Sequence, residues 1–143
     1  MTLLARWRAM PSPDRRALWP AAWRLLGVRL LLAMLGTART QRTLARRAAP
    51  PPRRITSPEP WQSRARALQR VSTRMPATRC LARSLTLWWW MRAEGLKPQL
   101  RMGVRPGQAA VEGHAWIECD GHLFDETVDG AATYSLLHWN PPE

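Results

Sequence analysis

The dipeptide Asp120-Gly121 constrains the fold of this chain most strongly. It lies between two segments, residues 109–119 and 122–125, that are rich in strand-forming side chains. Asp-Gly is a preferred two-residue connection between antiparallel strands, because both of its residues tolerate a positive φ. We therefore predict a tight β-hairpin in the carboxyl-terminal part of the chain.

The two-residue turn also predicts the register of this hairpin. The expected pairs are Cys119 with His122, Trp116 with Asp125, and His114 with Thr127. Successive side chains alternate between the faces of a strand, so five of them should share one face: His114, Trp116, Glu118, Leu123 and Asp125. A one-residue bulge would exchange Asp125 for Glu126 on that face.

Helical spacing of apolar residues precedes the hairpin. It covers residues 14–47, 61–74 and 79–94. Thr78 and Gly95 are suited to begin and end the last of these helices. A short strand is expected after Gly95, over residues 99–104. Helices followed by antiparallel strands indicate an α+β fold, with a helix that carries Cys80 packed on a small antiparallel sheet.

A proline-rich segment divides the chain into three parts. Residues 1–47 form a basic helical segment, residues 48–57 a stiff linker rich in proline and arginine, and residues 58–143 the remaining domain. Three consecutive prolines favour an extended linker, because each fixes φ and lacks an N–H donor.

Charge is distributed unevenly along the 143 residues. The net charge is +12, but residues 1–79 hold 17 arginines and two acids, whereas residues 80–143 hold five basic residues and eight acids. A strongly basic segment favours an anionic partner or surface, or simply a solvated helix face. The two cysteines provide no disulfide framework, which favours a reducing, cytoplasmic location.

The basic front helix is not expected to span a membrane or to act as a secretory signal. Arg24 and Arg29 interrupt its apolar sequence, and the longest stretch without charge, residues 30–38, is far shorter than the roughly 20 residues that a span needs. Two alternatives stay open. The helix packs against the rest of the chain, or it lies on anionic lipid with Trp19 and Trp23 inserted.

Cys80 is the candidate nucleophile. We predict it in the first turn of a helix, where the positive end of the helix dipole stabilises a thiolate. His114 on a neighbouring strand can take and return the proton of that thiol. A carboxylate from Asp125 or Glu126 can fix the orientation of the imidazole and stabilise its charge. This combination is typical of cysteine-dependent acyl transfer.

A metal site is the competing interpretation of the same residues. Cys119 and His122 have a spacing that zinc ligands use, and Cys80 and His114 would complete a set of four. The paired Cys-x-x-Cys element of structural zinc sites is missing, so we expect neither a metal nor a cofactor.

Three segments stand out, which begin at Cys80 (Cys-Leu-Ala-Arg-Ser-Leu-Thr-Leu), Leu100 (Leu-Arg-Met-Gly-Val) and His114 (His-Ala-Trp-Ile-Glu-Cys-Asp-Gly). They resemble the stand-alone leader peptidases of lasso-peptide biosynthesis, which belong to the transglutaminase-like superfamily. The resemblance implies a papain-type site with Cys80 as nucleophile and His114 as base. An ungapped match puts the family's aspartate on Glu126 and its asparagine on Asp125, whereas the simple hairpin prefers Asp125. Both remain candidates for the third residue.

The resemblance further implies a role in bacterial peptide maturation. The enzyme would cleave the leader from a ribosomally made precursor peptide, so that an ATP-using lasso cyclase can close the ring. A separate precursor-recognition protein would hold the leader, with the basic front half and residues 88–90 as its expected contact surface. A transglutaminase-like acyltransferase, with an amine as acceptor, and a basic module that binds nucleic acid or a membrane without catalysis are the alternative functions.

Overall fold

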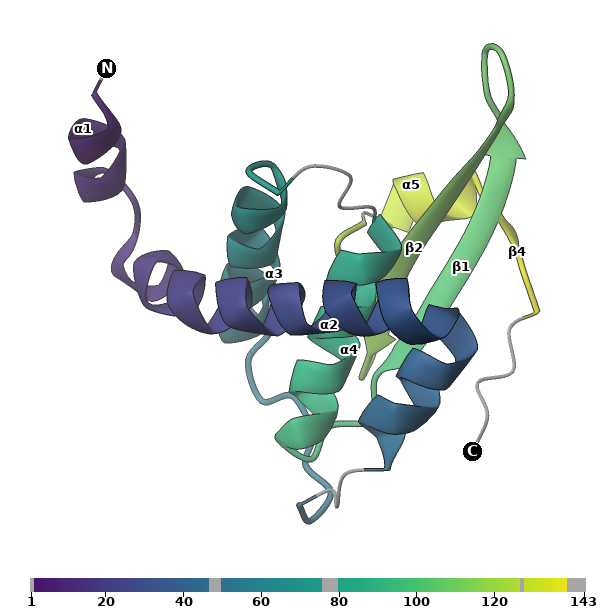
Figure 1. Ribbon diagram of the computed structural model, residues 1–143, viewed down its shortest axis with the longest axis horizontal. Helices are drawn as coiled ribbons and strands as arrows, with labels where there is room; N and C mark the ends of the chain where they lie inside the picture. The colour runs from purple at the N-terminus through teal and green to yellow at the C-terminus, as the bar shows by residue number, and fades with distance from the viewer. Residues whose placement is uncertain (1, 47–49, 76–79, 127, 139–143) are drawn as a thin grey trace.

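The computed structural model describes residues 2–46, 50–75, 80–126 and 128–138. The longer helices precede a small sheet along the chain, and one short helix lies between its last two strands (Figure 1). In chain order the elements are α1 (Leu3–Arg8), α2 (Ser12–Ala45), α3 (Glu59–Ser72), α4 (Cys80–Ala93), β1 (Gln99–Pro106), β2 (Val111–Cys119), β3 (His122–Phe124), α5 (Val128–Ala132) and β4 (Ser135–Leu136). The sheet order is β3-β2-β1-β4, and each strand runs antiparallel to its neighbours. The predicted α+β fold is confirmed.

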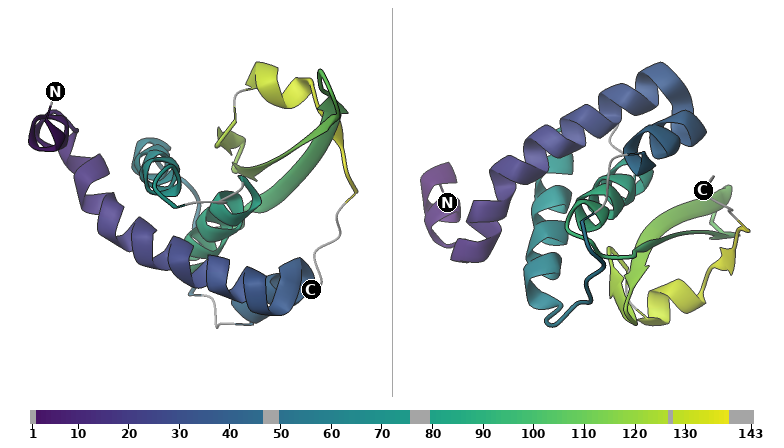
Figure 2. Two further views of the ribbon diagram at one scale, coloured as in Figure 1. Left: turned by 45° about the horizontal axis from the view of Figure 1, so that its top comes forward. Right: turned by 90° about the horizontal axis from the view of Figure 1, so that it is seen from below.

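Helix α4 is the centre of the molecule. It packs on β2 and β1 with one side and on α2 with another, while α3 lies beside both α2 and α4 (Figure 2). Fully buried apolar side chains come from α2, α3, α4, β2 and β3: Leu25, Leu68, Leu85, Met91, Ile117 and Phe124. Each contributes about 1.5–3 kcal/mol relative to an exposed position. The front helix therefore belongs to the same hydrophobic core as the sheet.

The hairpin turn forms as the dipeptide predicts. Asp120 and Gly121 both have positive φ, 49° and 78°, and Cys119 pairs with His122. The ladder between β2 and β3 ends at Phe124, so the expected pair of Trp116 with Asp125 does not form. Asp125 has a φ of 67°, which turns the chain out of the extended conformation.

The predicted pair of His114 with Thr127 lies outside the described residues, because Thr127 is not among them. The register between β1 and β2 nevertheless assigns the two faces of the sheet. Leu100 lies opposite Ile117 on the face that packs against α4. Gly103 lies opposite His114, and Arg101 opposite Trp116, on the other face.

Helix α4 carries the three consecutive tryptophans. It begins at Cys80 and ends at Ala93, and the expected cap Thr78 is outside the described residues. Trp88 and Trp90 are each only 5% exposed, and Trp89 contacts Trp23 of α2 edge-on at 6.0 Å between ring centroids. The expectation of an exposed aromatic surface at residues 88–90 is wrong, because α2 and α3 cover this part of α4.

Gly95 ends this helix region with a φ of 86°. Its carbonyl accepts a hydrogen bond of 2.9 Å from the Arg53 N–H. A Cβ atom at position 95 would approach the carbonyl oxygen of Pro51 to 2.4 Å, so a larger residue would push the proline-rich segment away. Glycine is therefore required here both by its backbone conformation and by this close contact.

Helix α2 departs from the expected geometry at Gly36. This residue has a φ of 72° and a ψ of 176°, which breaks the helix and separates a first leg, residues 12–35, from a second leg, residues 37–45. Pro20 lies inside the first leg and is tolerated there. Glycine makes the break inexpensive, because it adopts positive φ without steric cost.

Asp14 joins the first leg of α2 to α3. Its carboxylate is 1% exposed and accepts hydrogen bonds from Arg66 at 3.2 and 3.3 Å and from Arg70 at 2.5 Å. Burial alone would raise the pKa of Asp14, but the hydrogen bonds from Arg66 and Arg70 outweigh it and hold the pKa below the usual value. The ionised form of Asp14 therefore stabilises the fold.

Asp14→Asn is expected to lower the free energy of unfolding at neutral pH by about 1–2 kcal/mol, because the neutral amide loses the negative charge and one of the two oxygens that accept from the guanidinium groups. A depressed carboxyl pKa gives stability that is present above the unfolded pKa and lost as pH falls through the folded pKa. Urea unfolding at several pH values should thus show a difference in the free energy of unfolding between wild type and variant, and this gap should narrow below about pH 4. A gap that stays constant with pH would contradict this role.

Candidate active site

Cys80 is the first residue of α4. Its side chain is partly exposed and touches the edge of the hydrophobic core. One turn later, Ser84 donates a hydrogen bond of 2.9 Å to the carbonyl oxygen of Ala115, the residue that follows His114 on β2. Ser84 is 1% exposed, so this bond ties the first turns of α4 to β2 inside the core.

His114 is held by the segment that follows β3. Its Nε2 atom lies 3.1 Å from the main-chain oxygen of Asp125 and 3.2 Å from Oε2 of Glu126. A carbonyl oxygen can only accept a hydrogen bond, so Nε2 carries a proton and donates it. Nδ1 of the neutral ring then holds the lone pair that a general base needs.

The carboxylates of Asp125 and Glu126 have different partners. Glu126 contacts the His114 ring, whereas Oδ2 of Asp125 accepts a hydrogen bond of 3.1 Å from Nε of Arg83 on α4. Burial raises the pKa of the Asp125 carboxyl, although Arg83 acts in the opposite direction. Asp125 thus links α4 to His114 through its side chain on one side and its carbonyl on the other.

These bonds place the beginning of α4 beside the open edge of β2. Arg83 and Ser84 are three and four residues after Cys80, so all three lie near one side of the helix. Strand β3 pairs with β2 only from Ile117 to Cys119, so the edge of β2 at His114 is left to the segment after Phe124. Among the described residues, the hydrogen bonds that join the first turns of α4 to this edge come from Arg83 and Ser84. They do not include a hydrogen bond between Cys80 and His114.

An aromatic cluster covers the outer side of His114. The imidazole stacks on Trp116, with centroids 6.0 Å apart, and lies 5.6 Å from the ring of Tyr134. Gly103 makes room for it, because a Cβ atom there would approach Cβ of Tyr134 to 2.6 Å. The packed rings limit the orientations that the imidazole can adopt. Tyr134 and Arg83 were not identified from the sequence.

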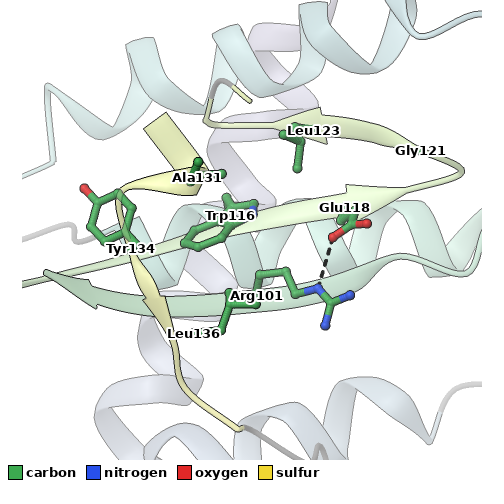
Figure 3. A pocket seen from close by; sticks show the side chains of 9 residues that line it. Arg101, Trp116, Glu118, Gly121, Leu123, Ala131, Tyr134 and Leu136 are labelled. Carbon is green, nitrogen blue, oxygen red and sulfur yellow. Dashed lines mark hydrogen bonds and ion pairs between the residues drawn. The ribbon is translucent and has the colours of Figure 1, made fainter. Parts of the chain in front are cut away.

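A shallow pocket of about 420 Å³ adjoins this cluster on the same face of the sheet (Figure 3). Its residues come from β1, β2, the hairpin turn, α5 and the segment around β4: Arg101, Trp116, Glu118, Gly121, Leu123, Ala131, Ala132, Tyr134 and Leu136. Arg101 and Glu118 form an ion pair of 3.1 Å at one end. Trp116, Glu118 and Leu123 share this face, as the hairpin register predicts.

Cys119 and His122 lie opposite each other beside the turn. Cys119 is 2% exposed and belongs to the core that packs against α4, and burial raises the pKa of its thiol to about 11. Within the described residues no three His, Cys, Asp or Glu side chains are placed to hold a metal ion.

Iodoacetamide is expected to label Cys80 and to spare Cys119 in the native protein at mildly alkaline pH. Cys80 is partly exposed, whereas Cys119 is buried and mostly protonated with a pKa of about 11. Because the thiolate is the reactive form, the two rates should differ by at least about 100-fold. Peptide mapping should show one modified cysteine in buffer and two in urea. Equal labelling in buffer would contradict the burial of Cys119.

Comparison with known proteins gives one finding about the family. A family model described as the transglutaminase-like superfamily matches residues 22–138. The matched range begins inside α2 and contains Cys80, His114, Asp125 and Glu126. No curated protein and no solved structure matches the chain.

Proposed function

The chain belongs to the transglutaminase-like superfamily, and on that premise we propose that it is a cysteine peptidase that removes the leader from a lasso-peptide precursor. The superfamily fold is typically that of cysteine peptidases and acyltransferases. The resemblance of the segments that begin at Cys80, Leu100 and His114 to lasso-peptide leader peptidases favours a peptidase within this class.

The geometry of His114 is the observation that carries the proposal. Nε2 is engaged by the Asp125 carbonyl and the Glu126 carboxylate, which leaves Nδ1 as the basic nitrogen. The same arrangement stabilises the imidazolium that forms when Nδ1 takes a proton, because Glu126 lies 3.2 Å from the opposite nitrogen. An orienting acid, an imidazole of defined tautomer and a helix-terminal thiol are the parts that a cysteine peptidase needs.

The proposed reaction has two halves. Nδ1 of His114 takes the thiol proton of Cys80, and the sulfur forms a bond to the scissile carbonyl carbon. The C–N bond breaks, the leaving amine of the core peptide takes the proton from His114, and a thioester of the leader remains on Cys80. Water then loses a proton to His114 and attacks the thioester, which releases the leader acid and restores the thiol. In enzymes without substrate, catalytic hydrogen bonds are often long. Binding of the substrate is expected to bring the Cys80 thiol within hydrogen-bond distance of Nδ1 of His114.

Substrate delivery is expected to require other proteins. The scissile bond of a flexible precursor must reach Cys80 at high effective concentration, which a separate recognition protein that binds both the leader and this chain would provide. The basic front half would attract an acidic leader segment. The released core peptide would pass to a lasso cyclase, and the whole sequence would take place in the cytoplasm.

Precursor cleavage with and without the recognition protein tests the proposal. We expect the recognition protein to accelerate the appearance of free leader and free core, measured by mass spectrometry, and added salt to reduce this acceleration. If the precursor alone is cleaved as fast as the precursor with the recognition protein, in low salt and in high salt, the delivery step is wrong. Absence of any cleavage in the complete mixture would overturn the peptidase assignment.

A further inference from the structure

The first leg of α2 carries an exposed apolar stripe. The stripe consists of Trp19, Trp23, Leu26, Leu30 and Met34, whose exposed fractions lie between 46% and 79%. Their spacing of three or four residues puts them on one side of the helix. Isolated exposed apolar residues are common on soluble proteins, but a continuous stripe along about four helical turns marks an interaction surface.

The stripe lies opposite the side of α2 that packs inside the protein. Ala21, Leu25 and Val28 are fully buried, and this buried side faces α3 and α4. Figure 2 shows α2 at the outside of the molecule, with α3 and α4 on one side of it. Helix α2 is thus apolar on two opposite sides, and within the described part of the chain the stripe side is covered only where the edge of Trp23 meets Trp89.

The charge around the stripe indicates the kind of partner. The first leg of α2 contains four arginines and a single acid, Asp14, which is 1% exposed and paired with Arg66 and Arg70. Arg15 and Arg16 flank the beginning of the stripe. An apolar face bordered by arginines and without an exposed carboxylate is complementary to anionic lipid headgroups above hydrocarbon.

The orientation of α2 on a membrane follows from its packing. By length and composition α2 is long and apolar enough to cross a bilayer, as are core helices of soluble proteins. The break at Gly36 and the packing of the first leg on α3 and α4 instead leave only the stripe side accessible. A helix of this kind lies in the plane of the interface with its tryptophans at headgroup depth.

We propose that the exposed stripe of α2 docks this protein on the surface of an anionic bilayer, with the helix parallel to the membrane plane. Helix α4 lies between α2 and the sheet strands. Bonds from Arg83 and Ser84 hold its first turn, which carries Cys80, beside β2 and the segment after β3, on the side of α4 away from the stripe. The candidate active site would therefore face the aqueous side, where a peptide can reach it. This surface does not depend on the reaction that the site performs.

Vesicle flotation of the full chain tests the proposal. We expect the protein to float with vesicles of phosphatidylcholine and phosphatidylglycerol, to bind pure phosphatidylcholine at least about tenfold more weakly, and to be released in part by about 0.5 M salt. The triple variant Trp19→Ser, Leu30→Ser, Met34→Ser should lose at least about tenfold in binding to the anionic vesicles, because the inserted apolar side chains are gone.

Val111→Ser is the matched control. Val111 is 70% exposed on β2, and its substitution should leave vesicle binding unchanged. Selective labelling of Cys80 over Cys119 checks that both variants are folded. Three results would overturn the proposal: no binding of wild type to anionic vesicles, equal binding of the triple variant, or release only by detergent, which would indicate a spanning helix. Because the measurement is binding alone, its failure would leave the peptidase assignment unaffected.

Discussion

Cys80→Ala is expected to lower the rate of precursor cleavage by at least about 10³-fold while the fold stays intact. The substitution removes only a sulfur atom from a partly exposed position at the start of α4, so little packing is lost. Without that sulfur no thioester can form. The rate is measured as free core peptide released per unit time in the presence of the recognition protein.

Cys119→Ala is the matched control for this experiment. Its thiol is 2% exposed and faces the core rather than the candidate site, so the variant should cleave at close to the wild-type rate despite a small loss of stability. Circular dichroism shows whether both variants fold. Wild-type activity in Cys80→Ala would eliminate the cysteine peptidase mechanism.

Glu126→Gln is expected to cost about 10²–10⁴-fold in kcat, the second large effect. The amide cannot stabilise the imidazolium charge on His114, whose Nε2 lies 3.2 Å from the carboxylate. Asp125→Asn should cost about tenfold or less, because Asp125 contacts the imidazole through its main-chain oxygen, which the substitution retains. Its loss would come through the weaker bond to Arg83.

Parallel kinetics of the two variants, with kcat and KM measured separately, distinguish the roles of the acids. His114→Ala provides the reference for complete loss of the base. A greater loss in Asp125→Asn than in Glu126→Gln would show that the carboxylate of Asp125 turns toward the ring during catalysis. Equal tolerance of both changes would mean that another group orients His114.

The local chemistry of the turn was sufficient to predict the hairpin and its first pair. Asp120 and Gly121 favour positive φ whatever the surrounding structure is, so Cys119 and His122 come into register. The end of the ladder was not predictable in this way. Asp125 adopts a φ of 67° while its carboxylate bonds to Arg83, a residue 42 positions earlier in the chain. Tertiary contacts of that kind leave no periodic signal in the sequence.

The front helix shows the same division between local and tertiary information. Spacing of leucines predicted a helix, and α2 confirms it. The same spacing did not indicate which side of α2 would face the core, because α2 is apolar on two sides. Which side becomes buried depends on the packing of α2 on α3 and α4. The burial of Trp88 and Trp90 follows from that choice, since α2 and α3 cover the helix that carries them.

Cleavage in water labelled with heavy oxygen tests the central claim most directly. A cysteine peptidase resolves the thioester with water, so the new carboxyl terminus of the leader should carry one labelled oxygen, and the core peptide should appear with a free amino terminus. An acyltransferase would join the leader to an amine and incorporate no label. Labelled leader in the wild-type reaction and none with Cys80→Ala is the predicted result, and an unlabelled or amine-linked leader would contradict the peptidase assignment.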